Sequence, residues 1–344
     1  MFILNETGRI QVFDNWGVDF TIQKNYAVPL TFVKGGVFTT SIEGKPGFSK
    51  WKSFENIRLM FGENVPIVLN RSFALGDVLM LVPVINYLKS IGWNAWLDTD
   101  FTRFTQFTGL DIRYRRMKET PIGLMLDHLL EFDHNPDHPY SRLHRVDIYA
   151  DALGIKIPKK LNWNIDFKET IPIDDTDYVA VQVGGSTRMK TLKPGYIMTI
   201  VRLLRKRGYK VVLFGVSNGD KIQMPDIDGV LNLIDKIDLR ELFGLIRRAR
   251  ILISMDSSPL WISHFTRTPV IMLHGSTRVQ ERLTRHPLFP HQTGSVDLAG
   301  LVGCTACFET AKYCADKISC MRTLSVKRLG ESVGQQLNKL EGNI

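Results

Sequence analysis

The chain has 344 residues, of which 44% are hydrophobic and 23% charged, a composition typical of a folded globular protein and not of a disordered or fibrous one. At about 100–200 residues per domain, this length favours two domains. No run of about eighteen uncharged apolar residues occurs, and the first residues lack the basic flank and apolar core of a secretory signal. We therefore expect a cytoplasmic protein without a transmembrane segment.

The net charge of +9 is concentrated in one region, since residues 182–250 hold 14 Lys and Arg against 6 Asp and Glu. Such a region favours an anionic ligand: a phosphate, a nucleic acid or an acidic lipid headgroup. The alternative is that these side chains coat solvated helix faces. The runs RLLRKRGYK and IRRARI favour this alternative, because each precedes an apolar strand in an alternating pattern.

Residues 1–65 are rich in short β-type runs broken by Gly and Asn, and they predict a small β-rich N-terminal appendage or an extended arm. From residue 66 strands and helices alternate. PIVLN predicts a strand, VLMLVPVINYLKSIG a helix and WNAWLDTD the next strand. The polar stretch 127–147 predicts a long exposed loop, and VDIYADALGI a short helix that ends at Gly154.

Residues 156–177 have few helix signals and several Pro and Asp, so we place a linker there. A second alternating series follows, with strands expected in YVAVQVG, YKVVLFG, RILISMD and TPVIMLHG and helices between them. The pattern predicts an α/β protein with two Rossmann-like domains that face a cleft, at 66–170 and 171–330, and a C-terminal helix or tail at 331–344.

The first candidate site is the turn RSFALGD, between the strand at 66–70 and the following helix. Unpaired N–H groups at a helix start attract negative charge, and Gly76 lets a ligand approach the backbone. Asp77 could accept a proton from a hydroxyl nucleophile at the cleft. The alternative, favoured from these residues alone, is that Asp77 caps the helix.

The second candidate is VQVGGSTRMKTLKPGY at 181–196, where a strand runs into two glycines, hydroxyl side chains and two lysines. Flexible backbone donors, hydroxyls and a cation suit a diphosphate. The spacing is that of neither a P-loop nor a dinucleotide fingerprint. A polar connecting loop is the alternative.

The third candidate is SMDSSPLWISHFTRTPVIMLHGST at 254–277. Asp256, Ser257 and Ser258 follow a strand where a helix begins, so their amides and hydroxyls could hold phosphate or ribose oxygens. Helix capping is again the alternative.

In this order and spacing the three loops resemble glycosyltransferase family 9, the ADP-heptose:lipopolysaccharide heptosyltransferases and their relatives, over residues 66–325. ALGDVLMLVPVINYLK is similar to the first loop and helix of that family, VQVGGSTRMKTLKP to its phosphate loop and MDSSPLWISHFTRTPVIMLHGST to its donor-binding signature. CTACFETAKYCADKISCM is similar to a Cys-rich tail of many members.

The resemblance implies a GT-B fold, with the acceptor on 66–170 and the nucleotide-sugar on 171–330. It implies an inverting, metal-independent transfer of a sugar such as heptose, with an ADP-sugar favoured as donor. The acceptor would be a hydroxyl of a glycan or glycolipid, as in lipopolysaccharide biosynthesis, with peripheral membrane contact. Asp77 would be the catalytic base, and Thr187 and Lys190 would hold the leaving diphosphate. The donor-binding residues it implies are Gly76, Gly185, Ser186, Thr187, Lys190, Gly215, Asp256, Ser257, Ser258 and Leu260.

All four cysteines, Cys304, Cys307, Cys314 and Cys320, fall within seventeen residues. Four thiolates suit a structural zinc, and an iron–sulfur cluster or two disulfides are the alternatives. The expected reducing compartment favours a metal or free thiols, which would anchor the tail and take no part in catalysis. No cofactor is expected for the reaction.

The His-rich loop at 127–147 contains two prolines and offers no helical spacing for a metal, so we expect it to contact the acceptor through His134, His138 and Arg142. Two other functions remain. The same fold could glycosylate nucleic acid or a modified base, as the basic region would suit. It could also be a catalytically inactive nucleotide-sugar-binding protein, because Trp261 stands where the family often has His.

Overall fold

The computed structural model divides the chain into two compact units, Met1–Asp166 and Phe167–Ile344, called here the first and second unit. The structure describes backbone and side chains at 68–69, 71, 74–99, 101, 143–160, 173, 177–185, 190–217, 227–275, 277, 279, 282–283, 286–289, 292–299 and 323–342. It describes the backbone alone at residues 67, 70, 280 and 281, in strand 122–125 and in the strands before residue 60.

The first unit contains a six-stranded sheet in the order β7-β1-β4-β10-β8-β9. Strands β4 (Tyr26–Pro29), β10 (Ile122–Met125), β8 (Ile67–Asn70) and β9 (Ala95–Asp98) run parallel. Strand β1 (Phe2–Leu4) pairs antiparallel with β4 on one side and with β7 (Lys50–Lys52) on the other. Helix α2 (Leu75–Ser90) connects β8 to β9 and packs against α4 (Arg145–Ala152). The α/β alternation expected from residue 66 is therefore present.

The β-rich stretch at 1–65 divides between two sheets. Its strands β1, β4 and β7 extend the main sheet of the first unit, so they are not part of a separate appendage. A second, four-stranded antiparallel sheet has the order β3-β2-β5-β6, made by β2 (Ile10–Phe13), β3 (Asp19–Ile22), β5 (Thr39–Ile42) and β6 (Lys45–Pro46).

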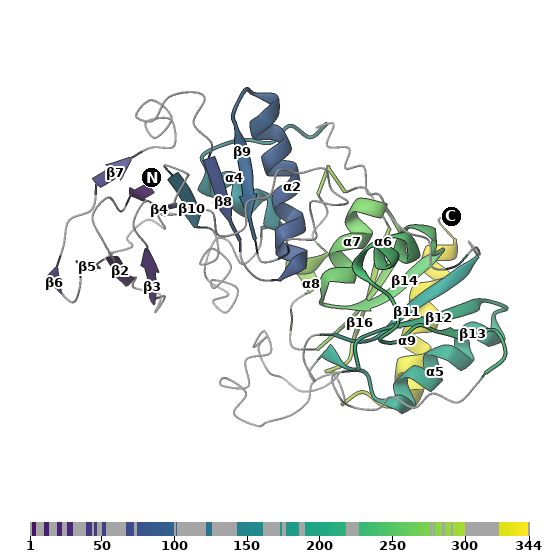
Figure 1. Ribbon diagram of the computed structural model, residues 1–344. Coiled ribbons are helices and arrows are strands. Elements are labelled where there is room, and N and C mark those ends of the chain that lie inside the picture. Colours follow the sequence, from purple (N-terminus) through teal and green to yellow (C-terminus); the bar gives the residue numbers. More distant parts are fainter. Residues whose placement is uncertain are drawn as a thin grey trace. The chain divides into compact units, whose positions relative to one another are not determined.

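The second unit contains a six-stranded, fully parallel sheet in the order β13-β12-β11-β14-β15-β16 (Figure 1). Its strands are β11 (Tyr178–Gly184), β12 (Lys210–Gly215), β13 (Val230–Asn232), β14 (Ile251–Met255), β15 (Val270–His274) and β16 (Thr293–Asp297). Numbered along the chain, this is the doubly wound order 3-2-1-4-5-6. The strand order reverses between β11 and β14, and ligands of such sheets bind outside the carboxyl ends of the strands at that point.

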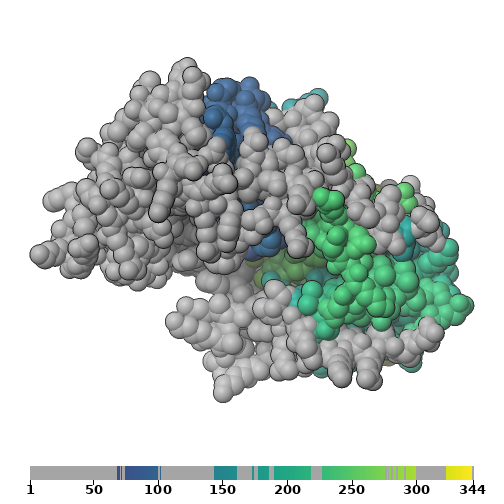
Figure 2. Space-filling view, in the orientation of Figure 1, coloured from purple at the N-terminus to yellow at the C-terminus, as the bar shows by residue number. Residues whose placement is uncertain are grey.

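Helices cover both faces of this sheet. On one face α5 (Pro194–Lys206) packs against α9 (Val326–Glu341), and on the other α6 (Leu239–Arg248) packs against α7 (Ser258–Thr266) (Figure 1). The short helix α8 (Val279–Arg282) follows β15. In the space-filling view, the green side chains around α6 and α7 form one continuous surface of this unit (Figure 2).

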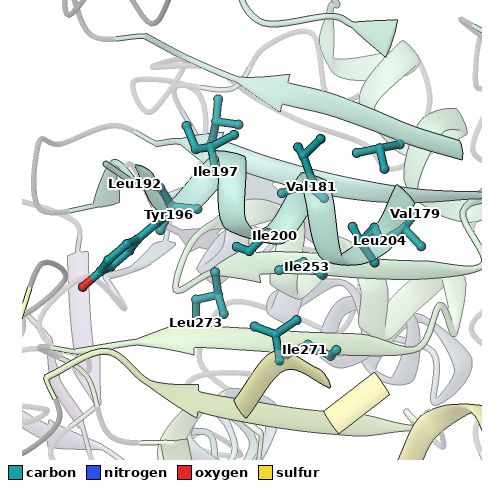
Figure 3. Packing of buried hydrophobic residues seen from close by; sticks show 14 of the residues in the cluster. Val179, Val181, Leu192, Tyr196, Ile197, Ile200, Leu204, Ile253, Ile271 and Leu273 are labelled. Carbon is teal, nitrogen blue, oxygen red and sulfur yellow. The ribbon is translucent and has the colours of Figure 1, made fainter. Parts of the chain in front are cut away.

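Side chains alternate between the two faces along each strand, which explains why the central strands β11, β14 and β15 are almost entirely apolar. Val179, Val181 and Val183 of β11 join Ile253 and Ile271 in the core beneath α5 and α9, as Figure 3 shows for four of them. The even positions of β11 point to the other face, where the Tyr178 hydroxyl donates to the Leu245 carbonyl of α6 at 2.6 Å. Gln182 therefore lies on the face covered by α6 and α7.

The C-terminal helix α9 is part of this core and not a loose tail. Four of its apolar side chains, Leu329, Val333, Leu337 and Leu340, are buried in the α5 cluster. Among the helices that the structure describes, none has the length and apolar composition that a membrane crossing requires.

Candidate functional site

Asp77 lies in the first turn of α2 in the first unit. It is the third residue of the helix, and the N-cap position is occupied by Ala74, which makes no side-chain capping bond. Its carboxylate pairs with the Arg71 guanidinium at 2.9 Å and with the Arg145 guanidinium at 3.4 Å. The Asp77 side chain is 16% exposed, whereas both arginines are nearly buried. The carboxylate is thus oriented from two sides and still reaches the surface.

The turn before α2 contains a strained residue. Ala74 has a φ of 61° and ψ of 90°, a conformation that residues with a Cβ rarely adopt. Its carbonyl accepts the amides of Asp77 at 2.9 Å and Val78 at 3.1 Å, which begins the helix. Such strain gathers at functional turns because the surrounding structure must hold it.

In the second unit, the carboxyl ends of β11 and β12 approach so closely that only glycine fits. Gly215 has a φ of +127°, and a Cβ there would lie 2.5 Å from the Gly184 carbonyl oxygen. A Cβ on Gly184 would collide with the Val216 carbonyl, and one on Gly185 would lie 3.1 Å from the Lys190 Cβ. The predicted phosphate loop therefore begins with glycines, and the absence of side chains there would let a ligand approach the backbone closely.

A buried glutamine connects this edge to the loop after β14. The Gln182 side-chain carbonyl accepts hydrogen bonds from the Ser254 hydroxyl at 2.7 Å, the Ser257 hydroxyl at 2.9 Å and the Met255 amide at 3.2 Å. Its amide group donates to the Gly184 carbonyl at 3.0 Å. Ser257 is the N-cap residue of α7, yet its side chain makes no capping bond. Helix capping therefore does not account for this hydroxyl.

Asp256 is held by an ion pair within the second unit. Its carboxylate accepts from the Arg282 guanidinium of α8 at 2.9 Å, and both side chains are less than 10% exposed. Next to it in the sheet, burial lowers the pKa of His274, while Asp297, a hydrogen bond to the Thr277 backbone and Asp256 act to raise it. At the carboxyl ends of β14, β15 and β16, charged side chains are therefore compensated by neighbours of opposite charge.

The predicted site residues divide into three groups. Gly185, Gly215, Ser257, Ser258 and the half-buried Lys190 lie at or just beyond the carboxyl ends of strands in the second unit. Gly76 is buried in α2, and Leu260 is buried in α7 with its amide bonded to the Ser257 carbonyl, so both support these turns. Ser186, Thr187, His134, His138, Arg142 and the four cysteines Cys304, Cys307, Cys314 and Cys320 lie outside the described residues.

Sequence reasoning missed Gln182, Arg71, Arg145 and Arg282. Gln182 alone left a signal, because it is the only amide side chain in the apolar run YVAVQVG. Arg145 and Arg282 meet partners that no local pattern identifies: Arg145 and Asp77, for example, are 68 positions apart. Arg71 stands in the predicted turn itself, but its pairing with Asp77 was not predicted.

Part of the basic excess at 182–250 serves the fold. Arg207 donates to Asn338 and to Glu341 of α9 at 2.7 and 3.1 Å, and Arg205 donates to the Tyr209 carbonyl at 2.8 Å. These guanidinium groups join elements within the second unit, so they are not a ready surface for a polyanion.

The family comparison matches residues 156–313 to glycosyltransferase family 9 (heptosyltransferase). Among solved structures, the iron-containing dodecameric glycosyltransferase TibC from enterotoxigenic E. coli is 15% identical with a TM-score of 0.61, and the match covers 100% of this chain and 96% of TibC. A family 9 glycosyltransferase from Veillonella parvula is 14% identical with a TM-score of 0.57, covering 80% and 98%. The E. coli heptosyltransferase WaaC, bound to ADP-2-deoxy-2-fluoro heptose, is 13% identical with a TM-score of 0.54, covering 80% and 99%.

No curated protein matches the sequence. The family match and the shared architecture confirm the resemblance to glycosyltransferase family 9 and the α/β fold of the GT-B type. Residues 156–313 are thus similar to the heptosyltransferase family, and the chain shares the fold of these glycosyltransferases.

Proposed function

We propose that the chain transfers a sugar from a nucleotide-sugar to an acceptor hydroxyl, with inversion and without a catalytic metal. The observation that carries the proposal is the position of the predicted donor residues at the strand-order reversal of the second sheet, next to bare glycine backbone. An ADP-sugar is the favoured donor, since TibC has been solved in complex with ADP-D-β-D-heptose and WaaC with an ADP-heptose analogue. Heptose is the favoured sugar for the same reason.

In this proposal Asp77 is the base that takes the proton from the acceptor hydroxyl as that oxygen attacks the anomeric carbon. Arg71 and Arg145 hold its carboxylate in one orientation, which a general base within hydrogen-bond reach requires. The bond to the diphosphate breaks on the opposite side, and negative charge develops on the leaving oxygen. Lys190, Thr187 and backbone amides after β11 stabilise that charge without a divalent cation.

The acceptor is proposed to be a glycan or glycolipid hydroxyl, contacted on the first unit by the loop with His134, His138 and Arg142. Peripheral contact with a membrane would bring a glycolipid to this loop. A glycan is favoured over nucleic acid as acceptor, because Arg205 and Arg207 of the basic region are engaged within the fold.

The four cysteines are proposed to hold one structural metal in the C-terminal part of the second unit. Their donor set fits, because four thiolates are the ligands of structural zinc and of many iron sites. The iron-containing description of TibC favours iron. Thiolate ligation also favours the cytoplasm as the compartment, where thiols stay reduced. Metal analysis of the purified chain, compared with Cys307→Ser, tests this part.

The donor and the base can be tested separately. When ADP-, UDP-, GDP- and dTDP-sugars are compared, we expect the ADP-sugar to raise the melting temperature most, because a bound donor stabilises the folded protein by mass action. Asp77→Asn should keep this shift and lose about 10²- to 10⁴-fold in transfer rate, because only the proton acceptor is removed. Asp151→Asn, on the exposed side of α4, is the matched control and should keep full activity.

Three results would contradict the proposal. They are full turnover by Asp77→Asn, a retained anomeric configuration in the product, and the absence of any nucleotide-sugar effect on the wild-type melting curve.

A further inference from the structure

Gln182 is a polar side chain at a buried position of a central strand, where apolar side chains are usual. It is 2% exposed and lies in β11, whose other residues are apolar, aromatic or glycine. Burying a primary amide is unfavourable unless its groups find hydrogen-bond partners, so its presence needs a reason. Neither the packing of the sheet nor the proposed chemistry of Asp77 and Lys190 supplies one.

The hydrogen bonds of Gln182 fix its orientation. The Met255 amide can only donate and the Gly184 carbonyl can only accept, so the side-chain oxygen must face Met255 and the nitrogen must face Gly184. The hydroxyls of Ser254 and Ser257 then donate to the same oxygen, at 2.7 and 2.9 Å. A reversed amide would set its N–H groups against the Met255 N–H and its oxygen against the Gly184 carbonyl.

The position of Gln182 in the sheet explains which segments it joins. β11 and β14 are neighbours, and the strand order reverses between them. The loop that leads to Lys190 leaves from β11, and the loop that leads into α7 leaves from β14. Gln182 is bonded to the last residue of β11 through Gly184, to the last residue of β14 through Met255, and to the N-cap of α7 through Ser257.

We propose that Gln182 is a positioning residue that holds the carboxyl end of β11, at Gly184, and the N-cap of α7, at Ser257, in one frame for the donor diphosphate. The inference rests on the proposed function, since it assigns the same edge of the sheet to the donor. Because Gln182 is buried, it would act on the donor through the backbone of Gly184 and the hydroxyl of Ser257. The frame is neutral, so it adds no charge that would repel an anionic diphosphate or pair with the Lys190 ammonium.

The test compares donor binding with the fraction of folded protein. The probe is whichever of ADP, UDP, GDP and dTDP the wild type binds most tightly by calorimetry. Gln182→Met keeps the side-chain volume and removes all four hydrogen bonds. We expect its dissociation constant for that probe and its donor KM to rise about 10- to 100-fold, as misplaced binding groups produce, with the acceptor KM unchanged.

Two further variants make the test independent of folding. Ser254→Ala, a buried residue that loses one bond to Gln182, should raise the donor KM less and in the same direction. Val181→Ala is the control: it lies next to Gln182 on the opposite face, so it should lower stability and leave the donor KM at the wild-type value.

A conservative change gives a pH signature that a purely structural role would not. In Gln182→Glu, the protonated carboxyl has one acceptor oxygen and one O–H donor and can copy the amide, whereas the ionised form sets an oxygen against the Gly184 carbonyl. We expect donor affinity of Gln182→Glu to recover toward wild type as the pH falls, while that of Gln182→Met does not.

Wild-type donor affinity in folded Gln182→Met, or equal losses of donor affinity in Val181→Ala and Ser254→Ala, would overturn the role of Gln182 and leave the proposed function standing. A wild-type chain that binds none of the four nucleotides would overturn both.

Discussion

The candidate loops of the first unit and those of the second unit are held in opposite ways. In the first unit, the carboxylate of Asp77 is fixed by the guanidinium groups of Arg71 and Arg145, after a strained Ala74. In the second unit, the carboxyl ends of β11 and β14 are joined by neutral hydrogen bonds to Gln182, and Gly184 and Gly215 let the ends of β11 and β12 approach closely.

The difference follows from what each loop would have to do. A base must point at one proton, and ion pairs with planar guanidinium groups restrict a carboxylate better than neutral contacts do. A diphosphate carries its own charge, so a frame of amides and hydroxyls can shape its site without competing for it. Charged residues that do occur at the edge of the second sheet, such as Asp256, are compensated by a partner, here Arg282.

The close approach of Gly215 to Gly184, where β11 and β12 end, gives the largest predicted effect. Gly215→Ala would place a Cβ 2.5 Å from the Gly184 carbonyl oxygen at a φ of +127°. The ends of β11 and β12 would therefore have to move apart. We expect the free energy of unfolding of the second unit to fall by about 4 kcal/mol or more in urea denaturation. Gly208→Ala is the control, because φ is +84° there but nothing lies within 4 Å of the new Cβ. Equal losses of stability in both variants would show that the positive φ, and not the close approach of the two strands, sets the loss of stability.

The buried ion pair gives the next largest effect. Arg282→Met leaves the Asp256 carboxylate buried without the guanidinium that it accepts from at 2.9 Å. We expect a loss of about 3 kcal/mol in the free energy of unfolding, since removing one partner of a buried pair strands the other charge. Arg250→Met breaks the exposed pair with Asp177 at 3.2 Å and should cost about 1 kcal/mol or less. A loss in Arg282→Met no larger than in Arg250→Met would contradict the compensation argued above.

The sheet of the second unit was largely predictable from the sequence. Strands buried on both faces need continuous apolar runs, and YVAVQVG and RILISMD correspond to β11 and β14. The edge strand β16 (Thr293–Asp297) was not predicted, because TGSVD has neither an apolar run nor a clean alternation. A C-terminal helix or tail was expected at 331–344, but its packing was not, since the apolar stripe of α9 is buried only against α5, β15 and β16.

The site was predictable only as far as its loops. The turns after strand ends fixed Gly185, Lys190 and Ser257 as candidates, because strand-to-helix turns of parallel sheets gather at one edge. The contacts that set their geometry were not, since Gln182 meets Ser257 across 75 positions of the chain. Such pairs depend on strand order, which local periodicity does not contain.

The strained turn of the first unit predicts a change of the opposite sign. Ala74→Gly removes the Cβ from a residue with a φ of 61°, a conformation that glycine adopts without steric strain. We expect the free energy of unfolding to rise by up to about 1 kcal/mol, measured by urea denaturation of the full chain. Ala152→Gly, the same change at the end of α4, should lower it by a similar amount. A destabilised Ala74→Gly would mean that this turn is not strained.

His274 gives the smallest predicted effect, and one that depends on pH. Burial lowers its pKa in the folded protein, so the unfolded chain takes up the proton first as the pH falls through about 6.5. The contribution of His274 to stability is therefore steady at higher pH and decreases on acidification. Urea denaturation between about pH 8 and pH 5 should show a steeper loss for the wild type than for His274→Gln, which cannot gain a charge. Parallel curves for the two proteins would mean that Asp297 and Asp256 offset the burial completely, and the edge of β15 would then tolerate a cation as readily as the neutral ring.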